Sequence, residues 1–273
     1  MEHSKTGIEN LKLWTIIPWI IFWGTIGLIL DYVFRVNQYG VDFIGIYLYL
    51  MIFIWIVRGL NKRNIRLSDL SGRERVRVSW LKILSFVPVV KLASGSIMVL
   101  LGLILLYTFP IIGKIANSAD SINNQLLPIE IFFTFLTVII LAPIVEELFF
   151  RGMMLNKWGQ KYGLFKGIFF TSLIFAIVHP ASFFSAFLTS FLYSILYVKT
   201  KKLYIAIFAH SFGNLIVFLP RIFLEPSVLK SDVVSPTIIE LVATVGISIV
   251  LLSITMYGLY RMYPSDKTLP YLS

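Results

Sequence analysis

Long apolar runs separated by short polar segments make up most of the chain. The runs are about 16–25 residues long, close to the length of an α-helix that crosses the hydrocarbon core of a bilayer. The eight runs are Leu13–Phe34, Val41–Val57, Leu92–Phe109, Ile129–Phe150, Leu164–His179, Ala181–Val198, Leu203–Phe223 and Pro236–Tyr260. The pattern predicts a bundle of about eight transmembrane helices, in which Pro88 and Pro180 obscure the ends of the third and fifth.

The composition supports the same class of protein. Of the 273 residues, 58% are hydrophobic and 14% are charged, whereas soluble domains average about 25% charged residues. The chain has no cysteine, which excludes disulfides, thiolate metal sites and cysteine nucleophiles. The first run is too long for a signal peptide and lacks a small-residue cleavage site, so we expect it to remain as a helix. These features predict an all-α integral membrane protein with one polytopic domain over residues 1–273.

The distribution of basic residues predicts the orientation. If the basic segment Arg58–Lys91 is cytoplasmic, strict alternation of eight helices places twenty basic residues inside, Arg151 among them, and four outside. This bias predicts cytoplasmic N- and C-termini. The net charge of +10 is then explained by topology and by anionic lipid headgroups, so no nucleic-acid partner is expected.

The longest cytoplasmic segment is basic and contains regularly spaced apolar residues. In the stretch Arg73–Trp80, arginines alternate with Val76 and Val78. Such a stretch either lies on the membrane surface with its apolar side chains in the interface, or is a solvated loop that only sets orientation. The pattern does not choose between these two interpretations.

Ionisable residues at membrane depth are costly, so each one is a functional candidate. The fourth run ends with Glu146, Glu147 and Arg151. Glu147 and Arg151 have the i,i+4 spacing of a helical ion pair. Glu146 points about 100° away from that face and has no partner in its own helix. We therefore expect Glu147 to serve structure and Glu146 to be the reactive carboxylate, although both could simply cap the helix end.

Two histidines interrupt other apolar runs. His179 ends the fifth run, and His210 lies in the seventh with Asn214 four residues later, on the same helical face. A single histidine of this kind is usually structural. Together with a carboxylate, however, two imidazoles and an amide form a workable hydrolytic set, in which the carboxylate deprotonates water and the amide stabilises an oxyanion.

The depths of these groups agree only in part. With Arg151 taken to lie at the cytoplasmic surface, Glu146 and His210 should both lie about 10 Å into the membrane. His179 should lie about 20 Å deep if its helix begins at Leu164. That helix must therefore tilt, or begin near Ile168, for the three groups to meet.

Three motifs resemble those of a known family. They are Glu-Glu-x-x-x-Arg at 146–151, Phe-x-x-x-His at 175–179 and His-x-x-x-Asn at 210–214. In this order and on these spans they resemble the CPBP family of type II CAAX prenyl protease-like proteins, which includes the Abi and lysostaphin-resistance-A-like proteins. The resemblance covers residues 129–219, which we expect to form the catalytic core.

The resemblance implies an intramembrane endopeptidase. By motif position, Glu146 resembles the water-activating glutamate, His179 and His210 its partners, and Asn214 the oxyanion-stabilising residue. Glu147, Arg151 and Phe175 resemble supporting residues.

Cofactor, substrate and rival functions are expectations of the same kind. The family has been described both as metalloproteases and as glutamate proteases. We expect no cofactor, with zinc held by Glu146, His179 and His210 as the alternative. The expected substrate is a membrane-bound peptide or protein, lipidated or not, in a bacterial cytoplasmic membrane. The rival functions are a non-catalytic immunity or scaffold protein, as in bacteriocin self-immunity, and less favoured, a proton-coupled carrier.

Overall fold

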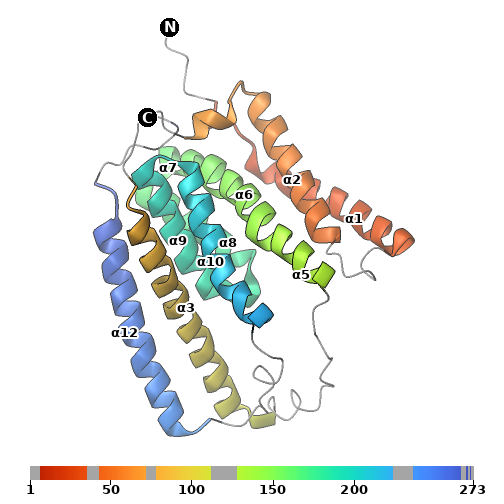
Figure 1. Cartoon of the computed structure of the whole chain (residues 1–273). Helices are drawn as coiled ribbons and strands as arrows, with labels where there is room; N and C mark the ends of the chain where they lie inside the picture. Colours follow the sequence, from red (N-terminus) through yellow and green to blue (C-terminus); the bar gives the residue numbers. More distant parts are fainter. Residues whose placement is uncertain are drawn as a thin grey trace.

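The computed structural model describes residues 7–35, 43–71, 78–111, 128–223, 236–265, 269 and 271, and within these ranges the chain forms helices and no strand (Figure 1). Short 3-10 turns at Leu13–Thr15, Leu67–Leu70 and Pro180–Ser182 accompany the longer helices. These helices are α1 (Ile16–Phe34), α2 (Phe43–Asn61), α3 (Trp80–Thr108), α5 (Pro128–Phe135), α6 (Ala142–Glu147), α7 (Asn156–Tyr162), α8 (Leu164–Ile177), α9 (Phe183–Thr200), α10 (Leu203–Phe223) and α12 (Ile238–Met262). Most of Arg73–Trp80 lies outside the described residues, so neither interpretation of that basic stretch is tested.

Seven helical segments of the described chain are long and apolar enough to cross a membrane. They are Leu13–Phe34, Phe43–Asn61, Trp80–Thr108, Pro128–Tyr162, Pro180–Thr200, Leu203–Pro220 and Ile238–Met262. The eighth predicted span corresponds to α8, which has 14 residues and is about 21 Å long, shorter than the hydrocarbon core. The all-α membrane bundle is confirmed, and this one helix is shorter than a full span.

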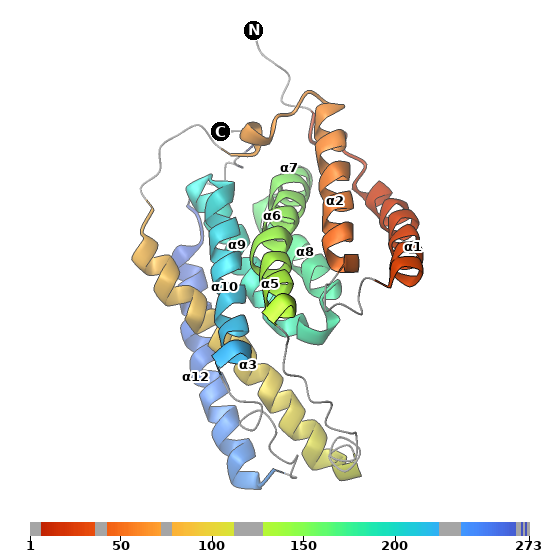
Figure 2. The same cartoon turned by 45° about the vertical axis from the view of Figure 1, so that its right-hand side comes forward.

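The helices are arranged around a central group. In Figures 1 and 2, α1 and α2 form a hairpin on one side, α3 and α12 form a long pair on the other, and α5–α10 lie between them. The α3–α12 pair is packed closely: a Cβ on Gly258 would lie 2.3 Å from the Phe86 ring. The central group carries most of the fully buried side chains. It contains all of the candidate site residues.

The fourth span is longer than its apolar run predicted. It continues from Pro128 to Tyr162, with π-helical segments at Leu136–Leu141 and Leu148–Leu155 on either side of α6. The expected end at Phe150 is therefore wrong, and Arg151 is fully buried instead of lying at the surface. The charge of Arg151 suggested that the span ends there. Hydrogen bonds from its guanidinium to Ser190 allow it to be buried instead.

The third span also begins earlier than predicted. α3 runs from Trp80 through Pro88, whereas the apolar run predicted a start at Leu92. A proline inside a transmembrane helix is tolerated when neighbouring groups satisfy the freed backbone. Lys91, which the charge pattern assigned to the cytoplasmic loop, therefore lies within the span.

Three glycines shape the turn that returns α8 alongside the fourth span. Gly163 has φ 86°, a conformation that favours glycine, and separates α7 from α8. A Cβ on Gly167 would lie 2.8 Å from the backbone of Gly159, so the two helices cross at van der Waals contact. The stretches Glu146–Tyr162 and Leu164–His179 run antiparallel on the two sides of Gly163 and are nearly equal in length. Glu146 and His179 therefore both lie about 22–24 Å from the turn. α8 begins at Leu164, as the apolar run predicted. The predicted depths of Glu146 and His179 disagreed because Arg151 was expected at the membrane surface, whereas it is buried.

The two described chain ends pack on α7. Lys157 donates hydrogen bonds to the carbonyl groups of Glu9 and Leu11. The backbone N–H of Tyr271 donates to the side-chain oxygen of Asn156 at 3.3 Å. Both ends therefore lie on the same side of the bundle, as the predicted topology requires. That this side is cytoplasmic stays a prediction.

Candidate active site

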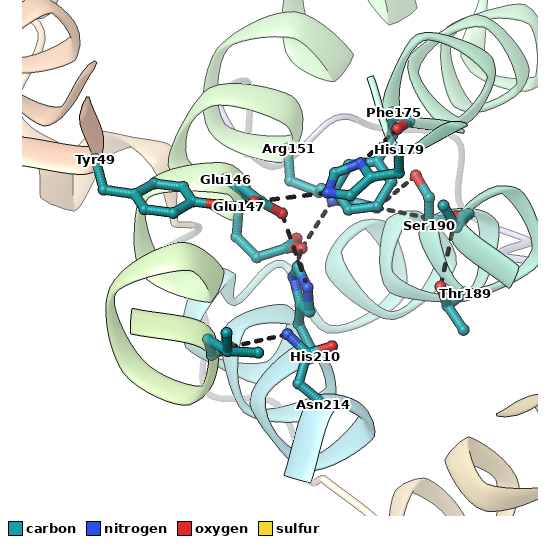
Figure 3. Close-up of polar contacts among 12 residues, drawn as sticks. Tyr49, Glu146, Glu147, Arg151, Phe175, His179, Thr189, Ser190, His210 and Asn214 are labelled. Carbon is teal, nitrogen blue, oxygen red and sulfur yellow. Dashed lines mark hydrogen bonds and ion pairs between the residues drawn. The ribbon is translucent and has the colours of Figure 1, made fainter. Parts of the chain in front are cut away.

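Glu146, His179 and His210 meet inside the bundle. They come from α6, from the residues just after α8, and from α10. The Nε2 atom of His179 lies 3.8 Å from Oε1 of Glu146, and Nε2 of His210 lies 3.8 Å from Oε2. Figure 3 shows the two imidazoles approaching the carboxylate from different segments of the chain. The three groups form one cluster, which we call the Glu–His cluster.

The Nδ1 atom of each imidazole has a hydrogen-bond partner that fixes the orientation of the ring. Nδ1 of His179 lies 2.7 Å from the carbonyl oxygen of Phe175, and Nδ1 of His210 lies 2.8 Å from Oε1 of Glu147. A carbonyl and a carboxylate can only accept, so both Nδ1 atoms donate and the two Nε2 atoms are left to face the carboxylate of Glu146. Each Nε2 atom is 3.8 Å from a different carboxylate oxygen, which is too far for a direct hydrogen bond.

A buried ion pair is hydrogen-bonded to the Glu–His cluster. Arg151 donates to Glu147 at 2.7 Å, as the i,i+4 spacing predicted, and both side chains are 0% exposed. The same guanidinium donates to the carbonyl oxygen and the hydroxyl of Ser190 at 2.8 and 2.7 Å. Glu147 thus accepts from Arg151 and His210 with one oxygen, which links the ion pair to the cluster.

Aromatic rings hold the imidazoles in place. Phe175 stacks on His179 with ring centroids 4.4 Å apart, and Tyr193 stacks on His210 at 5.0 Å. The guanidinium of Arg151 lies over both aromatic rings, at 5.1 and 5.6 Å from their centroids. Stacking of this kind restricts the orientation of each imidazole in addition to its hydrogen bond.

Two cavities meet at the cluster. A polar cavity of about 460 Å³ is lined by all three of its residues, by Asn214 and by serine and threonine hydroxyls. An apolar cavity of about 700 Å³ lies between the α1–α2 hairpin and the central group, and Glu146 and His179 also line it. Tyr49 of α2 lies at the junction, and its hydroxyl donates to Glu146 Oε1 at 2.6 Å.

Asn214 lies in the polar cavity on the same helix as His210, as their spacing predicted. One of its amide hydrogens is donated to the carbonyl oxygen of Val138 at 2.9 Å. Val138 belongs to a π-helical segment, where widened turns change the backbone hydrogen bonding. The bond connects α10 to the fourth span and leaves the second amide hydrogen of Asn214 for another acceptor.

The same geometry bears on the metal alternative. Among the described residues, no group of three or more histidine, aspartate or glutamate side chains is arranged to hold a metal ion. The expected absence of a cofactor and its alternative, zinc held by Glu146, His179 and His210, both stay predictions.

Several neighbours of the cluster were not expected from the sequence. Tyr49, Tyr193 and Ser190 are ordinary residues of apolar helices, and nothing in the chain marks them. Lys91 of α3 also lines the polar cavity. The unbroken helical pattern on both sides of Pro88 could have indicated that this lysine is inside the membrane.

Known proteins share the segment that forms this site. Residues 128–216 match the family model described as type II CAAX prenyl endopeptidase Rce1-like. The predicted family is confirmed over this segment. The match contains the whole Glu–His cluster, Asn214 and the ion pair, whereas Tyr49 and Lys91 lie outside it. The chain is accordingly a multi-pass membrane protein in which residues 128–216 are similar to this family.

A curated relative is similar over a shorter stretch. An uncharacterized 24.3 kDa protein of Escherichia coli is 42% identical over 52 residues, which are 18% of this chain and 24% of the relative. The alignment thus spans about a quarter of that relative. No solved structure matches the chain.

Proposed function

We propose that this chain is an intramembrane endopeptidase in which Glu146 activates a water molecule for attack on a peptide bond. The observation that carries the proposal is that the Nε2 atoms of two imidazoles flank the carboxylate of Glu146, each 3.8 Å from a different carboxylate oxygen. This separation is too wide for a direct hydrogen bond. It is typical of polar groups that are bridged by water.

The proposed reaction follows from these positions. Glu146 removes a proton from the water while His179 and His210 orient it, and the resulting hydroxide attacks the carbonyl carbon of the substrate. The second amide hydrogen of Asn214 stabilises the negative charge that develops on the carbonyl oxygen. The proton then passes from Glu146 to the leaving amine, which completes hydrolysis.

The apolar cavity supports a membrane-bound substrate. It lies between α1, α2 and the central group, is lined almost entirely by hydrophobic side chains, and ends at Glu146 and His179. An apolar segment or a lipid chain of a substrate would fill it and bring the adjacent peptide bond to the cluster. The proposed substrates are therefore membrane-associated peptides or proteins, with or without an attached lipid.

The test compares the wild-type protein with Glu146→Gln in native-like membranes. Glutamine retains the size of the side chain and removes the base, so we expect peptide products present only with the wild type and a loss of activity of at least about 100-fold. Glu130→Gln, in the same span but away from both cavities, is the matched control and should cleave normally. Equal peptide profiles of wild type and Glu146→Gln would contradict the proposal and favour a non-catalytic partner protein. A chelator added to the same samples tests the zinc alternative.

A further inference from the structure

Lys91 occupies an unusual place for a lysine. It lies about 16 Å along α3 from Trp80, next to Val90, which is 0% exposed. An ammonium group at membrane depth is costly unless it has a partner or faces a polar cavity. Lys91 forms no ion pair with any other described residue, whereas Glu147 is paired with Arg151 and Glu146 accepts a hydrogen bond from Tyr49. Its side chain donates no hydrogen bond within the same residues.

The packing directs this side chain into the polar cavity. Lys91 lines that cavity on the α3 side, together with Glu146 and His210. Its stem passes over Gly213 of α10, where a Cβ would lie only 2.8 Å from the Cε atom of Lys91. The hydroxyl of Ser94 bonds that of Ser185 at 3.0 Å and connects α3 to α9 at the same level. The absence of a side chain at Gly213 therefore leaves room for the stem of Lys91.

The charges lining the polar cavity indicate which kind of ligand the ammonium group of Lys91 would bind. The Glu–His cluster supplies acceptors, and the remaining polar groups, such as Asn214 and Thr189, are neutral. The positive charge of Arg151 is already balanced by Glu147 at 2.7 Å. Lys91 is thus the one lysine or arginine among the described residues that line the cavity, and it forms no ion pair with a described carboxylate.

We propose that the ammonium group of Lys91 binds a carboxylate of the substrate peptide. This inference rests on the proposed function, because it takes the polar cavity to receive a peptide. The carboxylate could come from the C-terminus of the peptide or from an acidic side chain, and the chemistry of recognition is the same. Binding it in the cavity would place the peptide relative to the Glu–His cluster, so Lys91 would select substrates and set the position of cleavage.

The test measures binding and not turnover. The full chain with Glu146→Gln, which prevents cleavage, is placed in lipid nanodiscs and titrated with a fluorescent hexapeptide of alanine, leucine and phenylalanine. The peptide is made with a free C-terminal carboxylate, with a C-terminal amide, and as the amide with one internal glutamate. Lys91→Met is compared in the same background, because methionine is as long and suits an apolar helix. Lys82→Met, an exposed lysine of the same helix, is the matched control.

We expect the free acid to bind at least about 30-fold more tightly than the amide when Lys91 is present. Lys91→Met should abolish this preference, while Lys82→Met should retain it. If the glutamate-containing amide binds as tightly as the free acid, a side-chain carboxylate serves as well as the C-terminus, and if it binds as weakly as the plain amide, only the C-terminus serves. The proposal is overturned if Lys91→Met weakens all three peptides equally, if neither carboxylate-containing peptide binds more tightly than the plain amide with Lys91 present, or if none of the peptides binds.

The outcome is separable from that of the proposed function. Cleavage that depends on Glu146, without any preference for the acid, would refute only the role of Lys91. A preference for the acid that disappears in Lys91→Met, without any cleavage by the wild type, would refute the peptidase proposal and leave a carboxylate-binding site.

Discussion

The buried pair of Glu147 and Arg151 allows a quantitative test of the site. Arg151 donates to Glu147 at 2.7 Å and to two oxygens of Ser190 at 2.7 and 2.8 Å, with no exposed surface. Replacing it by methionine leaves the carboxylate of Glu147 buried without its counter-charge. Removal of one partner from a buried pair costs about 3–5 kcal/mol, so we expect Arg151→Met to lower the free energy of unfolding by this amount.

A double-mutant cycle separates the charge effect from lost packing. Glu147→Gln alone should also cost about 3–5 kcal/mol, because it leaves the guanidinium unbalanced. Independent losses would add to about 6–10 kcal/mol in the double variant. We expect instead that the double variant is no less stable than either single variant, since neither charge is then left alone and the introduced amide can still accept from His210.

The measurement is equilibrium unfolding in mixed micelles, followed by helical content as the fraction of denaturing detergent rises. Lys166→Met, at an exposed lysine near the start of α8, is the control and should change stability by less than about 0.5 kcal/mol. A loss below about 1 kcal/mol in Arg151→Met would refute the reasoning. Additive losses in the double variant would show that the two side chains act separately.

Two further predictions concern the neighbours of the cluster. Tyr49→Phe removes the 2.6 Å hydrogen bond to Glu146. It should lower kcat about 10- to 100-fold, the value of a hydrogen bond to a charged group, and unchanged kcat in a peptide-cleavage assay would show that Tyr49 does not position the base. Gly213→Ala would place a Cβ 2.6 Å from the Tyr193 hydroxyl and should cost about 1–3 kcal/mol by overpacking. Gly95→Ala meets nothing within 4 Å and should stabilise slightly in the same unfolding assay, because alanine favours a helix; equal effects of the two substitutions would contradict the predicted crowding at 213.

The helical bundle could be predicted from the sequence because it depends on local patterns. An apolar run of sufficient length has to form a helix in a membrane, where every backbone group must be satisfied internally. The run Leu13–Phe34 therefore matches its observed span, and α10 has its predicted ends. The pairing of Glu147 with Arg151 was predicted for the same reason, since i,i+4 spacing brings two side chains together within one helix.

The predictions that failed concern charged residues inside helices. Arg151 and Lys91 both looked like residues at helix ends, because a charge in lipid is costly. Arg151 has Glu147 on its own helix, but only the tertiary structure supplies Ser190 and two aromatic rings for Arg151 and a polar cavity for Lys91. The depth of the Glu–His cluster was misjudged as a consequence.

The apolar pattern of the chain was enough to predict an all-α membrane bundle, and three motifs within it indicated the family and the candidate residues. Their spacing could not show that the imidazoles face Glu146 with their Nε2 atoms, because the partners of Nδ1 lie on other turns and other helices. Nor could it place Tyr49 beside Glu146, which is 97 residues away along the chain. Contacts of this kind depend on how whole helices pack, and packing is decided by the shapes of many side chains at once and not by any short pattern.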